Sequence, residues 1–330
     1  MKADEISLKT GAEKALVGTQ TRLPLFHKAR LMICEVRIMR ALTSSHIFVE
    51  TGPERYTSNH LSRILSTPPN RAHFIFGATI LGPGATSLGQ YLETHNLTNP
   101  TDHHDAPLQF AHKTSLDVWS YLKEDPMRSK IFNESMRSSA ILGAGTVPSF
   151  PFAAKLKCDS EDQVLIVDIG GGKGQALESI RIAFPELKGR MILQDLPEVI
   201  EDAKVSGHLP DSIEAMGVDF FKPQLVKGAK AYFLRRILHD WGDEASKSIL
   251  KNIISSMSID SRILINELVL PDEGCDRRMA LSDVVMMTFG GMERSETQWK
   301  FLLQGVGLEI KAIWRKDGEN LSVIEAVLGK

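Results

Sequence analysis

The chain of 330 residues carries a net charge of −2, and 42% of its residues are apolar. This length suits two domains of ordinary size, each with its own core. Because so neutral a chain has no broad cationic surface, we expect neither a nucleic acid nor a membrane as a partner. The three cysteines are widely spaced, which argues against a disulfide framework and favours a reducing compartment. The first segment lacks the apolar stretch of a signal peptide, and no apolar run is long enough to cross a membrane. We therefore expect a cytoplasmic protein.

The first half of the chain, residues 1–150, predicts a mainly helical domain. Apolar residues recur at three- and four-residue spacing in 38–42 and 61–65, as they do on the buried face of a helix. The stretch 68–107 is rich in Pro, Gly, Asn and His, and it predicts loops around short helices.

A short hairpin separates the first predicted helices. Residues 46–56 have the composition of two strands that turn near Gly52, and Asn59 is a candidate cap for the helix that follows. Helix, hairpin and helix in this order are typical of a winged-helix unit, an architecture that often binds DNA. The second helix offers only Arg63, and no basic cluster flanks it, so the sequence argues against DNA binding.

The second half, residues 151–330, predicts an α/β domain. Continuous apolar runs alternate with helical segments, as expected for parallel strands buried between two layers of helices. These runs lie at 164–167, 191–193, 231–234 and 263–265. Two further segments, 309–314 and 321–327, predict an antiparallel hairpin at the end of a mostly parallel, Rossmann-like sheet.

A glycine-rich turn follows the first of these strands. Asp168 precedes Gly170, Gly172 and Gly174, and a helix is expected from about residue 176. Glycines let the backbone approach a ligand closely, and the N–H groups at the start of the helix favour negative charge. A glycine cluster alone is a weak signal, because a simple tight turn is the less favoured but open alternative. Because Gln175 stands where a dinucleotide fingerprint has its third glycine, a pyrophosphate is poorly suited to this turn.

Acidic residues also follow the next two strands. Asp195, followed by Leu196, lies about twenty residues beyond the glycines, where a ribose would be recognised. Asp219 and Phe220 offer an acid for an adenine amino group beside an aromatic face. Each acid alone could be a helix cap, but successive strand ends are where open α/β sheets bind ligands. An adenosine without a pyrophosphate indicates S-adenosylmethionine (SAM).

A histidine follows the fourth strand. His239 lies at the same predicted edge of the sheet, where a general base would remove the proton from an acceptor oxygen during methyl transfer. Glu267, placed at the end of the fifth strand, and Glu293 are candidate carboxylate partners of the imidazole. In the plainer interpretation, His239 only caps a strand end and both glutamates are solvated.

These motifs resemble those of the plant- and fungus-type O-methyltransferases, which include the caffeate and chalcone enzymes and fungal secondary-metabolite relatives. The resemblance extends over almost the whole chain from Arg37. Its segments read VDIGGG at 167–172, LQDLP at 193–197, DFF at 219–221, HDWGDE at 239–244, GGMERS at 290–295 and, in the linker helix, FNESM at 132–136.

The resemblance implies roles for individual residues. The turn at Gly170 would hold the methionine part of SAM, and S-adenosylhomocysteine (SAH) would be the product. Asp195 would bind the ribose, and Asp219 and Phe220 the adenine. The other residues expected near the cofactor are Asp168, Gly172, Gly174, Leu196, Arg235, Asp240 and Trp241, with Arg235 in the place of the family's lysine. His239 matches the general base, and Glu267 and Glu293 match its flanking acids.

The expected acceptor is a phenolic or enolic hydroxyl on a small aromatic or polyketide-like secondary metabolite, because the base must meet a hydroxyl of reachable acidity. Residues similar to the family's substrate-enclosing segment are Phe132, Asn133 and Met136. Met286 and Met287, with Phe289 and Trp299, could line an apolar slot or belong to the core. We expect no metal, because His103, His104 and Asp105 lie far from the site in sequence.

In this family the N-terminal portion is a dimerisation module that lends residues to the partner's active site, so the resemblance implies a homodimer. Residues 5–17 are similar to the family's helix-turn-helix opening, which normally continues directly into 37–42. Here the unusual segment 18–36 intervenes. The resemblance also leads us to expect that the family's first helices are missing ahead of Met1, so the family does not predict the shape of the acceptor pocket's outer wall here.

Two other functions remain open at this point. Some fungal members of the fold keep the cofactor site but catalyse pericyclic reactions, in which the sulfonium serves as a fixed positive charge and no base is needed. The retained His239, Glu267 and Glu293 favour methyl transfer over this alternative. The third possibility is a catalytically silent scaffold that only binds the cofactor.

Overall fold

The computed structural model describes residues 25–141, 148–205, 209–317 and 321–329. Contacts within the chain divide it into two units, Met1–Phe74 and Ile75–Lys330. The functional division that we predict at residue 150 falls inside the second unit and stays a prediction. The expected opening at residues 5–17 lies outside the described residues.

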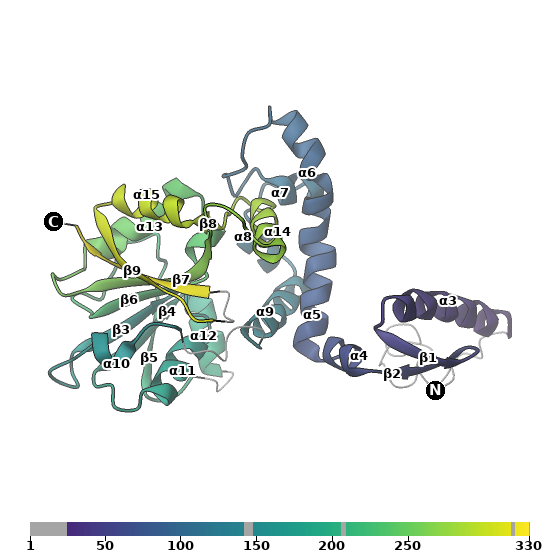
Figure 1. The fold of residues 1–330 in the computed structure, drawn as a ribbon, viewed down its shortest axis with the longest axis horizontal. Coiled ribbons are helices and arrows are strands. Elements are labelled where there is room, and N and C mark those ends of the chain that lie inside the picture. The colour runs from purple at the N-terminus through teal and green to yellow at the C-terminus, as the bar shows by residue number, and fades with distance from the viewer. Residues whose placement is uncertain (1–24, 142–147, 206–208, 318–320, 330) are drawn as a thin grey trace. The chain divides into compact units, whose positions relative to one another are not determined.

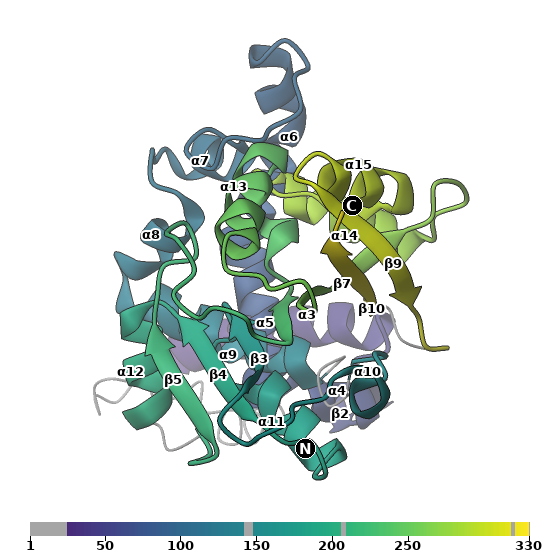
Figure 2. The ribbon, with the colours of Figure 1, turned by 90° about the vertical axis from the view of Figure 1, so that its left-hand side faces the viewer.

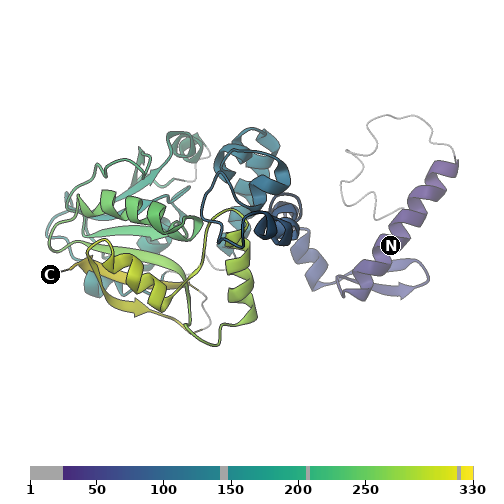
Figure 3. The ribbon, with the colours of Figure 1, turned by 90° about the horizontal axis from the view of Figure 1, so that it is seen from above.

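The described part of the first unit contains the predicted helix, hairpin and helix (Figure 3). Its elements are α3 (Leu25–Ser44), β1 (Phe48–Gly52), β2 (Arg55–Ser58), α4 (His60–Leu65) and the start of α5 (Pro68–Phe76). β1 and β2 pair antiparallel, and α3 contacts β1. Asn59 caps α4, because its side chain accepts a hydrogen bond from the N–H of Ser62 while the Ser62 hydroxyl accepts one from the N–H of Asn59.

The described residues in the first part of the second unit are mainly helical. The helices are η1 (Gly77–Leu81, a π-helix), α6 (Gly82–Thr94), α7 (Pro107–His112), α8 (Val118–Lys123), α9 (Pro126–Ile141) and α10 (Phe152–Lys155). The helices expected within 68–107 are present, but residues 68–94 are helical throughout, which leaves less loop than the sequence predicted. Pro83 does not break the helix, because it occupies the first turn of α6, where the missing N–H costs no helical hydrogen bond.

A mostly parallel sheet forms the second part, as predicted (Figure 1). Its strands are β3 (Val164–Ile169), β4 (Arg190–Asp195), β5 (Ile213–Gly217), β6 (Ala231–Arg235), β7 (Arg262–Leu270), β8 (Arg294–Ser295), β9 (Leu308–Trp314) and β10 (Leu321–Leu328). They lie in the order β5-β4-β3-β6-β7-β10-β9, with β8 paired to β7. β10 runs antiparallel to both β7 and β9, so the final hairpin is confirmed.

Helices cover both faces of this sheet (Figure 2). Those on the faces are α11 (Gln175–Ala183), α12 (Pro197–Val205), α13 (Asp243–Ile254) and α15 (Glu296–Gln304). The same part of the chain also contains the short 3₁₀-helix η2 (Leu238–Asp240) and α14 (Arg277–Met287), whose Met286 packs in a separate apolar cluster. Residues of α13 and α15 pack on one face, and residues of α10, α11 and α12 pack on the other. β3 is central, with Leu165 in one of these cores and Val167 in the other, which fixes the position of the turn that follows it.

Glu267 lies inside β7 rather than at its end. The strand continues to Leu270 because Leu268 pairs with Leu321 of β10 and Val269 pairs with Arg294 of β8. The Glu267 side chain is therefore fully buried in the sheet, and its position is set by strand pairing on both sides. None of the described helices has the length and apolarity needed to cross a membrane.

Candidate functional site

The turn after β3 has a backbone that requires glycine. Gly170, Gly172 and Gly174 have φ angles of 71°, 61° and 83°, in the left-handed region that other residues avoid. A Cβ atom on Gly170 would also lie 2.5 Å from Cδ1 of Ile237. A Cβ atom on Gly172 would meet only Oε1 of Gln175, at 4.0 Å, so the backbone of the turn is open at Gly172.

Asp168 is fully buried at the start of this turn, and neither of its carboxylate oxygens has a hydrogen-bond partner among the described residues. Burial, and to a smaller extent the charge of Asp195, raises the pKa of Asp168 to about 7 against the opposing effect of Arg235. Buried carboxylates in folded proteins are nearly always paired. Asp168 is therefore a candidate partner for a positively charged donor.

Asp195 joins the end of β4 to the glycine turn. One carboxylate oxygen accepts a hydrogen bond of 2.8 Å from the N–H of Gly172, and the other accepts one of 2.7 Å from the N–H of Leu196. Burial raises the pKa of Asp195, and these two donors oppose that effect. Each carboxylate oxygen has a second lone pair, so Asp195 can still accept hydrogen bonds from hydroxyl groups.

An aromatic wall stands beside the same turn. A Cβ atom on Gly170 would be 3.7 Å from the Phe220 ring, and the Phe220 and Trp241 rings make an edge contact at 6.0 Å. Asp219 accepts a hydrogen bond from the N–H of Phe221, whose ring also contacts Trp241. The structure thus brings the acids and the aromatic residues predicted at successive strand ends to one edge of the sheet.

His239 is buried among carboxylates in η2. Its Nδ1 atom lies 3.1 Å from Oε1 of Glu293 and 3.8 Å from Oε2 of Glu267, and its Nε2 atom lies 3.4 Å from Oδ1 of Asp240. The Ser282 hydroxyl donates a hydrogen bond to the same Glu293 oxygen. Glu267 uses its other oxygen to accept hydrogen bonds from the N–H groups of two residues of the turn, at positions 237 and 238.

These charges control the protonation of the site. Burial acts to lower the pKa of His239, but Glu267, Asp240 and Glu293 together raise it to about 9. Burial raises the pKa of Glu267 to about 7 against the opposing effect of His239. The Glu293 pKa is lowered, because its hydrogen bond with His239 and the charge of that imidazole outweigh burial. His239 is therefore a strong base whose orientation is fixed through Nδ1.

Arg294 was not identified from the sequence, although it lies next to Glu293. Its side chain is fully buried, and the guanidinium donates hydrogen bonds to the carbonyls of Leu238 and Trp241 and to the carboxylate of Asp243. These groups flank His239 in the chain, so Arg294 holds the turn that carries the imidazole. The role of Arg294 depends on its burial. The sequence does not show whether an arginine is buried or solvated, so this role could not be predicted.

The predicted acceptor residues are separated by the structure. Phe132, Met136 and Met286 share one apolar cluster, which also includes Trp119 and Phe289. Asn133 lies outside this cluster, on the exposed side of α9, and Met287 is half-buried and is not a member either. Trp299 is fully buried in the core between the sheet and α15, so it is a core residue.

One group of side chains among the described residues could hold a metal ion. Ligand atoms of His239, Glu267 and Glu293 lie within 4.8 Å of one another, close enough to surround an ion. His103 is distant in sequence but close in space, since its ring lies 4.3 Å from Trp241 and its Nδ1 atom lies 3.1 Å from the carbonyl oxygen of Phe289. The sequence could not reveal this contact because it depends on how residues 101–105 fold onto the turn.

The comparisons with known proteins identify the family. A model described as an O-methyltransferase domain matches residues 95–309. An O-methyltransferase of Pestalotiopsis microspora is 38% identical over 98% of this chain and 76% of its own length. A solved structure of OxaC with SAH and oxaline has a TM-score of 0.85 and 28% identity, covering 99% of this chain and 79% of that one. Another, described as a pericyclic reaction enzyme, has a TM-score of 0.83 and 29% identity, covering 99% and 86%. The chain therefore belongs to the O-methyltransferase family and is a SAM-dependent O-methyltransferase.

Proposed function

We propose that the enzyme methylates a phenolic or enolic hydroxyl of a small aromatic or polyketide-like metabolite, with His239 as the general base. The observation that carries this proposal is the buried hydrogen bond between Nδ1 of His239 and Glu293, beside the turn that follows β6. A base fixed through Nδ1 would take the acceptor's proton on Nε2, which lies 3.4 Å from Oδ1 of Asp240. A fixed orientation is what proton transfer requires.

In the proposed reaction, Nε2 of His239 takes the proton of the acceptor hydroxyl. The oxygen then forms its bond to the methyl carbon as the carbon–sulfur bond breaks, and the sulfur keeps the electron pair of that bond. SAM supplies the activated methyl group. A His239 pKa of about 9 is close to the pKa of about 10 of an ordinary phenol, so this proton transfer is nearly balanced in energy. An aliphatic alcohol would be far less acidic.

The residues at the sheet edge fit the cofactor. Asp168, with two unpartnered oxygens, suits the ammonium group of its methionine part, and the turn has open space for that part at Gly172. Asp195 would accept hydrogen bonds from the ribose hydroxyls. Asp219, Phe220 and Trp241 would enclose the adenine, with Leu196, Arg235 and Asp240 around them.

The acceptor would lie against the apolar cluster of α9 and α14. Phe132 makes edge contacts with Trp119 at 5.4 Å and with Phe76 at 5.5 Å, which provides an aromatic wall for a planar ring. Met136 and Met286 belong to the same cluster and add polarizable, adaptable surface. We no longer place Asn133 or Met287 against the acceptor.

Pericyclic catalysis is the second candidate, since a similar solved structure is described as a pericyclic reaction enzyme. Such a reaction needs a positive charge near a polarised carbonyl but no base. The three carboxylates that raise the pKa of His239 favour proton transfer instead. A silent scaffold is the third candidate, and no contact described above favours it.

The test is incubation of the purified protein with SAM and a panel of phenols, enols and aliphatic alcohols, with both products followed by mass spectrometry. We expect SAH to accumulate only with phenolic or enolic acceptors. A rearranged acceptor without SAH formation would support pericyclic catalysis, and bound SAM that is never consumed with any acceptor would support a scaffold.

We also propose that the protein is a cytoplasmic homodimer in which residues 1–150 mediate dimerisation and enclose the substrate, while 151–330 bind SAM. Exposed apolar side chains in the first unit support this proposal, including Ile38 at 59% and Leu61 at 42% exposure. Analytical ultracentrifugation of the full chain and of an Ile38→Glu variant would test it. A monomeric wild-type protein at micromolar concentration would contradict it.

A further inference from the structure

Helix α9 has two different faces. One carries Phe132 and Met136, which pack in the apolar cluster assigned above to the acceptor. The other is polar, and it forms one wall of a pocket of about 540 Å³. The lining residues from this polar face are Pro126, Ser129, Lys130, Asn133 and Glu134. Their spacing of three and four residues places them along one side of the helix.

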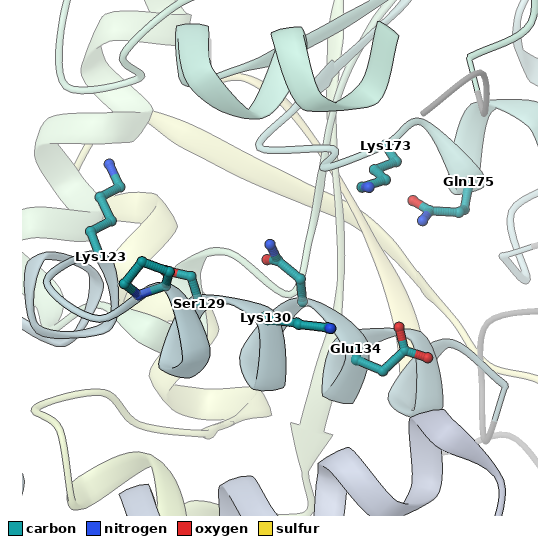
Figure 4. A pocket seen from close by; sticks show the side chains of 8 residues that line it. Lys123, Ser129, Lys130, Glu134, Lys173 and Gln175 are labelled. Carbon is teal, nitrogen blue, oxygen red and sulfur yellow. The ribbon is translucent and has the colours of Figure 1, made fainter. Parts of the chain in front are cut away.

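The opposite wall of the pocket is the glycine turn. Lys173 lies between Gly172 and Gly174, Gln175 begins α11, and both point across the pocket toward α9 in Figure 4. Because the turn is where the cofactor binds, the pocket opens onto the cofactor site. α9 therefore lies between the cofactor and the acceptor cluster, with its polar side toward the first and its apolar side toward the second.

The charges of the pocket favour an anion. Its lining includes Lys123, Lys130 and Lys173 but only one acid, Glu134. Lys123 is paired with Glu198, and Lys173 is paired with Asp202 at 2.8 Å. Among the described residues, no hydrogen bond or ion pair is formed by Lys130, whose side chain extends along α9 in Figure 4. An uncommitted ammonium group therefore remains beside the turn.

The methionine part of SAM carries two opposite charges. Asp168, buried with unpartnered oxygens, suits its ammonium group. Its carboxylate needs cationic or N–H donors close to the same turn. Lys130 and the side-chain amides of Asn133 and Gln175 provide them, and the first N–H groups of α11 add a favourable helix terminus.

We propose that the polar face of α9, through Lys130 and Asn133, binds the carboxylate of the methionine part of SAM. This inference rests on the proposed placement of the methionine part at the glycine turn, but not on the role of His239. It gives α9 two ligands, the cofactor on one face and the acceptor on the other. Asn133 thereby becomes a cofactor-binding residue rather than an acceptor-binding one.

The test is calorimetric binding of SAM and of decarboxylated SAM, which lacks only this carboxylate. The variants are Lys130→Gln, Asn133→Ala and Glu134→Gln, with Lys251→Gln on α13 as an exposed lysine elsewhere. A charge-assisted hydrogen bond contributes roughly 10- to 100-fold in affinity. We expect Lys130→Gln to weaken SAM binding by about tenfold and to leave the decarboxylated ligand unaffected.

The remaining variants test whether the effect is specific to the carboxylate of SAM. Asn133→Ala should weaken the binding of SAM but not of decarboxylated SAM, and by less than Lys130→Gln does. Glu134→Gln should increase the affinity for SAM relative to that for decarboxylated SAM. Lys251→Gln should change neither affinity. Equal weakening of both ligands by Lys130→Gln, or no weakening of either, would overturn the proposal. A His239→Ala variant should keep the full preference for SAM, so the base assignment and this inference fail separately. Thermal unfolding of each variant checks that the fold is intact.

Discussion

Glu293 holds His239 through a buried hydrogen bond of 3.1 Å between Oε1 and Nδ1. The same oxygen accepts the hydroxyl of Ser282, so its position is fixed from two sides. Glu267 lies farther from Nδ1, at 3.8 Å, and uses its other oxygen to bind the backbone of the turn. Glu293 therefore orients the imidazole, while Glu267 adds charge and supports the turn.

Replacing Glu293 by Gln keeps an oxygen for the hydrogen bond but removes the charge. We expect kcat to fall by roughly 10- to 100-fold, because a charged hydrogen-bond partner contributes about 1.5–3 kcal/mol. The KM for SAM should change little. Ser282→Ala, which removes the neighbouring hydroxyl but no charge, is the matched control and should lose far less activity. Equal losses in both variants would show that the charge of Glu293 is unimportant.

The pH dependence of methyl transfer should report the basicity of His239. The carboxylates raise the pKa of His239 to about 9, so the unprotonated base becomes more populated as the pH rises toward 9. Single-turnover rates should increase over this range, and in Glu293→Gln the increase should shift to lower pH. A rate that is constant between pH 6 and pH 9 would be inconsistent with this assignment.

The raised pKa of His239 should also make the free energy of unfolding depend on pH. The pKa of His239 in the folded protein lies above its ordinary value of 6.5. Its stabilising contribution is therefore fully present below about pH 6.5 and is lost as the pH rises through about 9. Urea unfolding of the wild type and His239→Asn at several pH values measures this loss as a shrinking difference in the free energy of unfolding.

Asp168→Asn should weaken SAM binding and at the same time change how the free energy of unfolding depends on pH. In the folded protein burial raises the pKa of Asp168 to about 7, above its ordinary value of 3.8. The buried carboxylate therefore lowers stability progressively as the pH rises from about 4 to 7, and the Asn variant should lack this pH dependence. SAM binding should weaken by about tenfold or more in the variant, because its ammonium group loses a charged partner. Urea unfolding and calorimetry measure the two effects independently.

Arg294→Met should destabilise the protein, because the carbonyls of Leu238 and Trp241 lose their buried donors. Breaking a buried ionic network by removing one partner costs about 3–5 kcal/mol, which urea unfolding would measure. Asp243→Asn is the milder control, because Asp243 is 55% exposed and both carbonyls keep their hydrogen bonds. If both variants are equally stable, the carbonyl contacts of Arg294 contribute little.

Much of the α/β part could be predicted because the residues that define each strand and turn are close together in the sequence. The buried strands, the glycine turn and the acids that follow each strand are adjacent in sequence, and parallel pairing brings their ends together. The positions of Asn133 and Met136 could not be predicted in the same way. They are three residues apart, and only the packing of α9 shows that one lines the pocket and the other the apolar cluster.

Contacts between segments that are distant in the chain could not be predicted from the sequence either. His103 lies against Trp241, and a Cβ atom on Gly290 would make a tight contact of 3.2 Å with the carbonyl oxygen of Asp102. Both contacts depend on how residues 101–105 fold onto the turn. The length of β7, which places Glu267 within the strand, likewise depends on its pairing with β8 and β10.

The most direct test of the account is the single-turnover rate of methyl transfer by His239→Asn, measured with saturating SAM and an acceptor identified in the panel. The account predicts that the rate falls by roughly 10²–10⁴-fold, the usual contribution of a general base, while the affinity for SAM stays within a small factor of the wild type. His104→Asn, which alters an exposed histidine, should retain full activity. A rate in His239→Asn equal to that of the wild type would contradict the role of His239 as the base.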